Sequence, residues 1–273
     1  MANFDSSVIE GFGDEWSRFD QSALDDRELS QMFENYFGIF PWSQLPDNAV
    51  GFDLGCGSGR WAKLVAPRVG TLHLIDPSSA LDVAKRNLSD AENCVFHKAA
   101  VDNIPLANES CDFGYSLGVL HHIPDTGAGL ASCVAKLKHG APFLLYLYYR
   151  FDNRPWWFRS IWKASEVLRF IISRSPHSVR YLLSQAASIG IYFPLAKLAK
   201  ILETRGYDVS NLPLAHYRNN SFYTMRTDAL DRFGTRLEKR FTRTEIDEMM
   251  REAGLENVIF GSAPYWTAVG FKK

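Results

Sequence analysis

The sequence predicts an α/β fold in which parallel strands alternate with helices. Short apolar segments alternate with helical stretches from residue 49 to residue 149, and the turn GCGSGR follows the first apolar segment. Helical stretches of this length can carry the chain from one strand to a parallel neighbour. The sequence therefore favours βαβ units with a glycine-rich turn at the end of the first strand.

Composition restricts the class of protein further. The chain has 273 residues and 46% hydrophobic residues, which is enough to build a core without disulfides or structural zinc. Its 30 Lys+Arg against 31 Asp+Glu argue against a protein that wraps nucleic acid. The four cysteines show no CxxC spacing, so we expect a reducing, cytoplasmic location and no metal site.

The elements follow in order along the chain. Residues 1–45 form an aromatic, acidic cap segment with a helix over 28–37 that ends at Gly38. Residues 46–150 form the core, and Asp125 is a candidate helix N-cap within it. The expected strands are 49–54, 71–75, 94–99, 111–118 and 141–149, and the expected helices are 61–69, 78–88 and 126–138.

The alternation stops at Arg150 and resumes near residue 241. Two aromatic-rich, basic helices are expected over 156–172 and 179–202, followed by a loop-like stretch to about residue 240. Thr242 and Glu245 then have capping-box spacing before a helix that ends at Gly254. Strands over 257–262 and 265–271 complete the core, so residues 151–240 are an insertion into a domain that 241–273 completes.

The glycine turn is the strongest local motif. Gly55, Gly57 and Gly59 would let the backbone turn sharply and approach a ligand at the carboxyl edge of the sheet. The spacing is GxGxG, whereas dinucleotide-binding turns have GxGxxG. Asp76 follows the second strand and lies 21 residues beyond Gly55, where a carboxylate can accept both ribose hydroxyls. This arrangement suits an adenosine-bearing cofactor.

These motifs resemble the class I S-adenosylmethionine-dependent methyltransferases, in the group with the type 11 methyltransferase domain. The resemblance rests on GFDLGCGSGRW, HLIDPSSALDVAKRN, HKAAVDNIPLANESCDFGYSLGVLHHIPD and the terminal strand pair, about half of the chain. It implies a Rossmann-like, seven-stranded sheet with the last strand antiparallel and helices on both faces. It also implies S-adenosyl-L-methionine as cofactor, with S-adenosyl-L-homocysteine as product.

The resemblance assigns the cofactor contacts by position. The region around Asp53, Gly55, Cys56 and Gly57 would cradle the methionine part, and Asp76, with Pro77, would hold the ribose. The remaining implied contacts are Ala100, Val101 and Asp102 at the adenine, and Leu117 and Gly118 to His122 beneath the sulfonium.

A transfer to oxygen benefits from a base, and His122 and His121 are the candidates at the carboxyl edge of the sheet. The alternative is that one histidine packs against the cofactor and the other caps a loop. Trp16 belongs to an FGxEW-type opening that closes over the cofactor in some relatives, and its aromatic face suits a sulfonium cation. The alternative for Trp16 is an anchor for the leading helix.

The insertion is basic. Residues 150–203 hold nine Lys/Arg and three Asp/Glu, a net +6. This composition suits a helical lid that docks an anionic or lipidic acceptor or touches a membrane surface. An ordinary amphipathic helix pair, with its aromatic face on the sheet edge and its basic face in water, is the alternative. The longest stretch without charge, 181–196, is shorter than the ~20 residues of a spanning helix, so no transmembrane segment is expected.

We therefore expect a methyltransferase that acts on a small or lipidic metabolite, with an O- or C-acceptor favoured and N open. Candidate substrate residues are Tyr149 and Arg150 at the end of the fifth strand and Tyr217 and Asn219 in the insertion. The base-gripping motif N/D-P-P-Y/F is absent after the fourth strand, which argues against nucleic-acid methylation. The alternatives are a non-catalytic protein that binds the donor and, less favoured by the glycine spacing, an NAD(P)-dependent oxidoreductase.

Overall fold

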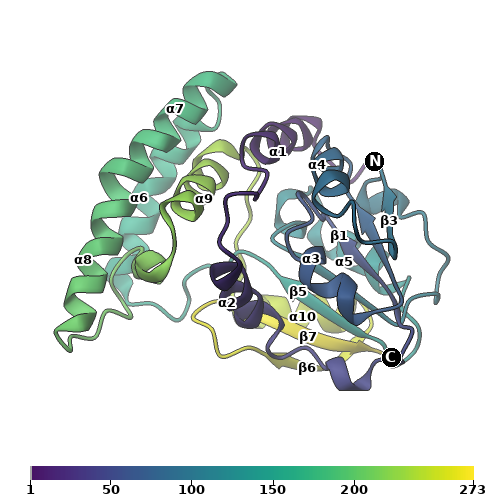
Figure 1. Cartoon of the computed structure of the whole chain (residues 1–273). Helices are drawn as coiled ribbons and strands as arrows, with labels where there is room; N and C mark the ends of the chain where they lie inside the picture. Colours follow the sequence, from purple (N-terminus) through teal and green to yellow (C-terminus); the bar gives the residue numbers. More distant parts are fainter. Residues whose placement is uncertain (1) are drawn as a thin grey trace. The chain divides into compact units, whose positions relative to one another are not determined.

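The computed structural model describes residues 2–273 and divides into two compact units. The core unit comprises residues 2–22, Leu29–Asp152 and Leu237–Lys273. The helical unit comprises Ala23–Glu28 and Asn153–Arg236, so most of it comes from within the predicted insertion 151–240. Figure 1 shows the sheet of the core unit and, in green, the helices of the helical unit.

The core unit contains a seven-stranded sheet with the order β3-β2-β1-β4-β5-β7-β6. Strands β1 to β5 pair in parallel, and β7 pairs antiparallel with both β5 and β6. This confirms the predicted α/β class and the antiparallel last strand. The strands are β1 (Val50–Leu54), β2 (Thr71–Ile75), β3 (Cys94–His97), β4 (Phe113–Leu117), β5 (Pro142–Tyr146), β6 (Leu255–Phe260) and β7 (Thr267–Lys272).

The strand order reverses direction beside β1. The chain leaves β1 for β2 and β3 on one side and then returns to place β4 on the other side. Loops that follow β1 and β4 therefore leave the sheet in opposite directions, and such a switch point is where open α/β sheets bind ligands. Phe52, Phe113 and Phe143 on the central strands are fully buried, as expected for a sheet covered on both faces.

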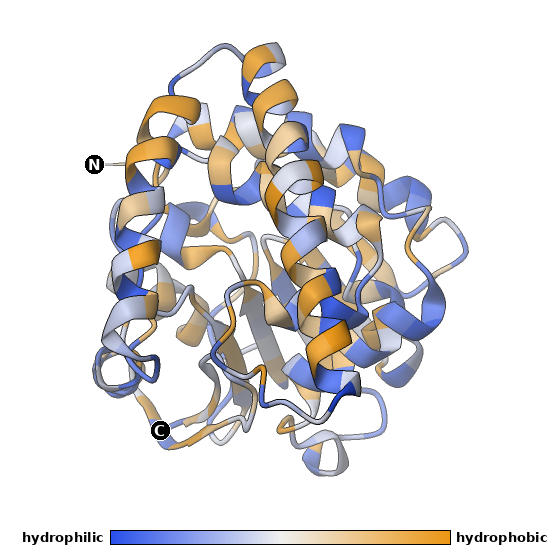
Figure 2. Cartoon of the chain, turned by 90° about the vertical axis from the view of Figure 1, so that its left-hand side faces the viewer, coloured by the Kyte–Doolittle hydropathy of each residue, from blue (hydrophilic) through white to orange (hydrophobic). Residues whose placement is uncertain are grey.

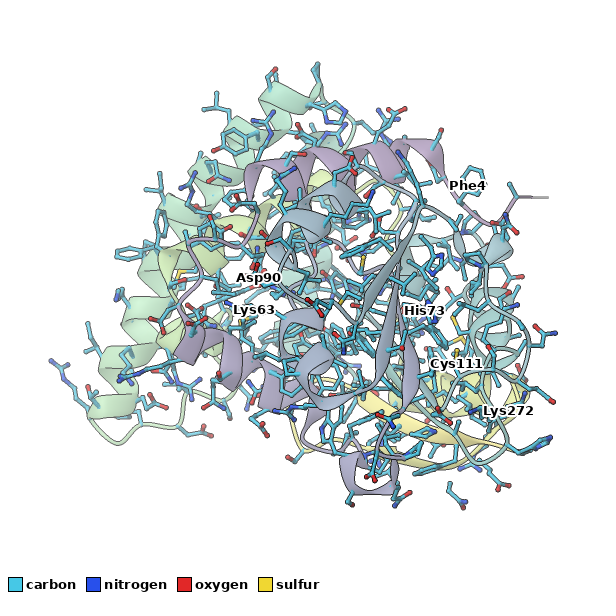
Figure 3. All side chains as sticks on the ribbon, turned by 45° about the vertical axis from the view of Figure 1, so that its right-hand side comes forward. Phe4, Lys63, His73, Asp90, Cys111 and Lys272 are labelled. Atoms are coloured by element: carbon cyan, nitrogen blue, oxygen red, sulfur yellow. The ribbon has the colours of Figure 1, made fainter. Side chains whose placement is uncertain are left out.

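Two helices of the core unit begin at the caps that the sequence predicted. The Asp125 side chain accepts a hydrogen bond from the Ala128 backbone N–H, and Thr242 and Glu245 form the expected capping box. The helices are α1 (Ser6–Arg18), α2 (Asp26–Phe37, whose first turn lies in the helical unit), α3 (Ala62–Val65), α4 (Ala80–Asn87), α5 (Thr126–Val134) and α10 (Arg243–Glu252). Figure 3 places His73 on β2, Cys111 just before β4 and Lys272 at the end of β7.

Short 3-10 turns interrupt the core where longer elements were predicted. The helix expected over 61–69 is α3 followed by a 3-10 turn over Ala66–Arg68, because Pro67 cannot donate the next helical hydrogen bond. The other 3-10 turns of the core are Trp42–Gln44, Val101–Asn103 and Leu120–His122.

The helical unit consists of α6 (Trp156–Ile172), α7 (His177–Ala187), α8 (Phe193–Thr204) and α9 (Phe222–Gly234), with a 3-10 turn over Ala215–Asn219. A π-helical turn, Ser188–Tyr192, joins α7 to α8. The resulting run His177–Thr204 has 28 residues and is long and apolar enough to cross a membrane by length and composition. The sequence predicted no such helix, because only the uncharged stretch 181–196 was considered. The helix continues past Arg180 and Lys197, the charged residues at the ends of that stretch.

The prediction of a loop-like stretch up to residue 240 is wrong over α9, which is helical. The Ser221 side chain caps this helix by accepting a hydrogen bond from the Thr224 backbone N–H. Met225, Ala229 and Phe233 lie one helical turn apart and are buried. The sequence held this four-residue spacing, but the polar residues between these positions hid it.

Candidate functional site

The loop after β1 needs glycine at its turns. Gly55, Gly57 and Gly59 have φ values of +76°, +52° and +76°, in the left-handed region that side chains disfavour. A Cβ on Gly55 would lie 2.4 Å from the Val119 side chain. The loop therefore presents bare backbone at the carboxyl end of β1, as the sequence predicted.

Asp53 is a buried acid at the base of this loop. Its side chain is 2% exposed, and its Oδ2 has no hydrogen-bond partner within residues 2–273. Burial raises the pKa of the Asp53 carboxyl to about 8, and the neighbouring Asp76 adds to the rise. The Ser58 hydroxyl in the same loop is also buried without a partner among the described residues. Orphaned polar atoms of this kind are costly and indicate a polar or charged ligand.

Asp76 joins the end of β2 to the glycine loop. Its Oδ2 accepts the Gly57 backbone N–H at 3.0 Å. Its Oδ1 accepts the Ser78 backbone N–H at 2.8 Å and the Ser78 hydroxyl at 2.6 Å. A carboxylate can accept about four hydrogen bonds, so these three leave capacity for a ligand hydroxyl. The structure thus brings the loop and the carboxylate together, with half-buried Pro77 beside them.

The region predicted to contact adenine lies on a 3-10 turn. Asp102 is exposed, and its Oδ2 accepts the Asn3 backbone N–H at 3.1 Å. The Val101 side chain belongs to the hydrophobic core, while Ala100 is half-buried. The leading segment therefore reaches the edge of the sheet where Asp102 lies, a contact that the sequence did not predict.

Helix α1 lies against the glycine loop. A Cβ on Gly57 would come within 3.0 Å of the Trp16 indole nitrogen, and the Arg60 guanidinium lies 5.7 Å from the centre of the Trp16 ring. Gly13 allows α1 to approach α4, because a Cβ there would lie 2.5 Å from the Ser79 hydroxyl. Trp16 is therefore in position to cover the loop and at the same time anchors α1.

The end of β4 borders open space. Gly118 has φ +79°, and a Cβ at this position would meet nothing within 4 Å. Ser116, two residues earlier, ties β4 to β1 by donating to the Leu54 carbonyl at 3.0 Å. Half-buried Leu117 lies between these two residues. Backbone at this position can be approached closely, as the expected sulfonium side of a donor site requires.

The two candidate histidines have opposite tautomers. The Nδ1 of His122 lies 2.7 Å from the Leu237 carbonyl, which can only accept, so Nδ1 carries the proton and the lone pair lies on Nε2. The Nδ1 of His121 instead accepts the Tyr148 backbone N–H at 3.4 Å, so its proton lies on Nε2. Burial lowers the pKa of His121 well below its usual value. This geometry favours His122 over His121 as a base.

His122 is covered in this structure. Its side chain is 3% exposed, and the ring of Phe12 on α1 meets it edge-on with the ring centres 4.9 Å apart. Its neighbour His121 stacks on Tyr148 at 3.9 Å. Access of an acceptor to His122 would therefore depend on α1.

The four predicted substrate residues are divided between the two units. In the core unit, Arg150 pairs with Glu245 at 2.9 Å, and Tyr149 packs on Phe151. In the helical unit, Tyr217 donates its hydroxyl to Asp228 at 2.7 Å, and the Asn219 side-chain oxygen accepts from Lys200 at 2.7 Å. Each has partners within its own unit, and its role in substrate binding stays a prediction.

Sequence reasoning missed a tyrosine cluster in the core unit. The rings of Tyr36, Tyr146 and Tyr265 lie 5.0 to 5.3 Å apart, and Trp61 lies 5.1 Å from Tyr36. Tyr146 ends β5, and its carbonyl accepts the Gly118 backbone N–H at 3.0 Å, which places the cluster next to the open end of β4. Burial raises the pKa of Tyr146, so its hydroxyl stays protonated at neutral pH. Only the run LYLYY, which begins at the end of β5 and continues beyond it, carried a signal of this cluster.

A known protein family matches this chain in sequence, and solved structures resemble it in fold. Residues 52–145 match the model of a family described as a methyltransferase domain. Among solved structures, an S-adenosylmethionine-dependent methyltransferase from Thermotoga maritima is 14% identical, with 96% of this chain and 100% of that chain covered and a TM-score of 0.51. An O-methyltransferase family protein from Burkholderia thailandensis is 13% identical over 94% of this chain and 59% of that chain, with a TM-score of 0.55. These structural similarities concern the fold, and no curated protein sequence matches the chain.

Proposed function

We propose a function from one premise: the core of this chain, residues 52–145, belongs to the class I S-adenosylmethionine-dependent methyltransferases, which use S-adenosylmethionine and release S-adenosylhomocysteine. The proposed reaction is methyl transfer to a small or lipidic metabolite through an oxygen or carbon acceptor. The observation that carries this proposal is the hydrogen bond between Gly57 and Asp76 beside the orphaned carboxyl of Asp53.

The residues of the site fit an adenosyl donor. The unpartnered oxygen of Asp53 would pair with the cationic amino group of the methionine part. Asp76 has acceptor capacity left for ribose hydroxyls. Because the pKa of Asp53 is about 8 in the free protein, its carboxyl is mostly protonated at pH 7 and would release its proton when a cation binds there.

The bound donor supplies a methyl group that is already activated by the sulfonium charge. The protein then has to hold the donor carbon and the acceptor in line, and such positioning can supply about 7 to 11 kcal/mol of a barrier. Trp16 and Phe12 on α1 would exclude water from the loop and from His122. For an oxygen acceptor, the Nε2 lone pair of His122 would take the hydroxyl proton.

The acceptor would lie beside Gly118. Open space at this glycine and the adjacent tyrosine cluster favour a flat or apolar acceptor that the rings of Tyr36, Tyr146 and Tyr265 can contact. We propose that the protein works in the cytoplasm, because its four cysteines are free thiols in this structure. Near-neutral net charge supports an acceptor other than nucleic acid.

The test is release of S-adenosylhomocysteine when the chain is incubated with S-adenosylmethionine and a fractionated metabolite extract. We expect release with at least one fraction. Asp76→Asn should weaken donor binding tenfold or more in calorimetry, at about 1.4 kcal/mol per tenfold. The control Asp82→Asn alters a carboxylate that is 63% exposed on α4 and should bind normally.

Two results would contradict the proposal. Donor binding without release in any fraction would indicate a non-catalytic binding protein. Binding of NAD or NADP in place of S-adenosylmethionine would indicate an oxidoreductase, in spite of the GxGxG spacing of the turn.

A further inference from the structure

In the helical unit, the second half of α6 turns the charged side chains of Glu166 and Arg169 toward α9. Glu166 pairs with Arg169 at 3.0 Å and also with Arg232 of α9. The Arg169 guanidinium donates to the Thr235 carbonyl at the end of α9 at 2.9 Å. Ion pairs therefore join α6 to α9 beside the apolar packing of Ile172 on the cluster that includes Met225 and Phe233, whereas a soluble helix normally packs through its apolar face alone.

Helix α7 repeats the same inversion. Arg180 is 6% exposed, and its guanidinium donates to the Gly234 carbonyl at 3.0 Å. Arg226 of α9 donates to the Gln185 side chain at 2.5 Å and to the Tyr181 hydroxyl at 3.0 Å. Both helices therefore contact α9 through polar groups, in addition to the apolar packing of Ile172 and Ala187 on the cluster that includes Met225 and Phe233.

The opposite faces of these helices are apolar and exposed. On α6, Val167 is 63% exposed, and on α7, Leu182 is 67% exposed. In Figure 2, the ribbons of these helices carry many hydrophobic segments in orange. The exposed apolar face, as we call it, consists of Val167, Leu168, Phe170, Ile171, Val179, Leu182, Leu183, Ile189, Ile191 and Phe193. A protein that met only water would not place so many aliphatic side chains outside and its ion pairs inside.

Basic and aromatic residues flank the exposed apolar face. Between residues 153 and 202 the sequence has eight Lys/Arg and a single acid, Glu166, which is the one turned toward α9. Arg159 and Lys163 are exposed on the first half of α6, and Lys197 is exposed on α8. Trp156, at the start of α6, is 73% exposed. Basic residues and tryptophan beside an apolar surface match the headgroup region of an anionic bilayer.

We propose that α6, α7 and α8 bind in the surface of an anionic lipid bilayer, with the exposed apolar face among the acyl chains and Arg159, Lys163 and Lys197 at the headgroups. The run His177–Thr204 is long enough to span a bilayer. A spanning arrangement would carry Gln185 and its partner Arg226 on α9 into the hydrocarbon, which is costly. Helices that lie in the membrane plane keep their polar contacts with α9 on the water side.

The experiment is flotation of the full chain with vesicles of phosphatidylcholine alone and of phosphatidylcholine with one third phosphatidylglycerol. We expect binding to the anionic vesicles that weakens as salt is added. The double variant Leu182→Asp and Val167→Asp should lower vesicle binding tenfold or more. Lys163→Glu with Arg159→Glu should lower binding to the anionic vesicles while leaving the weak binding to phosphatidylcholine unchanged.

A matched control distinguishes an effect of the exposed apolar face from the effect of removing any exposed apolar side chain. Ile259 on β6 is 53% exposed in the core unit, so Ile259→Asp should leave vesicle binding unchanged. Far-ultraviolet circular dichroism, which reports the helices that carry the substitutions, verifies that each variant is folded. Flotation needs no methyl acceptor, so its outcome is independent of whether the proposed methyl transfer is confirmed.

Two results would overturn the proposal. Equal flotation of the wild type and the double aspartate variant would show that the exposed apolar face does not contact lipid. A wild-type dimer without vesicle binding, converted to a monomer by the aspartates in light scattering, would show that a second copy of the chain covers the face.

Discussion

Asp53 is a residue whose ionisation is strongly changed by folding. Its pKa is about 8 in the folded chain, against an ordinary value of 3.8. The folded state therefore holds a proton that the unfolded state has lost between these two pH values, so stability falls as pH rises from about 4 to 8. The change should approach about 1.4 kcal/mol per pH unit within that window.

The prediction is tested by urea unfolding of the wild type and Asp53→Asn at several pH values. Asparagine does not titrate, so the wild type should lose stability relative to this variant as pH rises towards 8 and level off above it. A constant difference between the two proteins across this range would show that Asp53 ionises normally.

His122 is the proposed base for proton removal from a hydroxyl acceptor. If the acceptor is a hydroxyl, His122→Ala should lower turnover by a factor of 10² to 10⁴ and leave donor affinity nearly unchanged, because the base acts after binding. The measurement is the rate of S-adenosylhomocysteine release once an acceptor fraction is known. His121→Ala serves as the comparison, because the Nδ1 of His121 accepts from the Tyr148 backbone. A normal rate in His122→Ala would assign this side chain to packing against Phe12.

At the scale of elements, α1 determines how well the glycine loop is covered. Trp16→Ala removes the indole that contacts Gly57 and should weaken donor affinity about tenfold, whereas Trp16→Phe keeps an aromatic face and should weaken it less. Calorimetry with S-adenosylhomocysteine measures both. Phe4→Ala is the control, because Phe4 precedes α1 and is 41% exposed. Equal affinity in Trp16→Ala and the wild type would leave Trp16 as an anchor of α1 only.

The elements also show where local patterns suffice. The Asp125 N-cap and the Thr242–Glu245 capping box begin α5 and α10 as predicted, because a cap is satisfied by residues within three positions. Helix α9 was hidden because its buried positions are separated by polar residues, among them Arg226 and Arg232, whose partners lie on α7 and α6. Local periodicity cannot show that a charged residue will be buried against another helix.

At the scale of the whole molecule, donor binding should stabilise the core unit. A ligand that binds only the folded state at a hundred times its Kd adds about 2.7 kcal/mol. For a unit of this size, this corresponds to a rise in Tm of roughly 5 to 10 °C. Differential scanning calorimetry with S-adenosylhomocysteine should show the rise, and NAD at the same concentration should not. A comparable rise with NAD would contradict the donor assignment.

The sequence by itself determined the α/β class, the glycine loop, the acid after the second strand and the helix caps, because each depends on residues close together in the chain. Only the tertiary structure showed that Asp76 holds the Gly57 backbone, that the histidines have opposite tautomers and that Tyr36, Tyr146 and Tyr265 meet. It also showed that polar side chains of α6 and α7 contact α9 while apolar side chains of the same helices are exposed. These features depend on partners far apart in the sequence, and hydrophobic periodicity indicates only that a helix has two faces, not what each face meets.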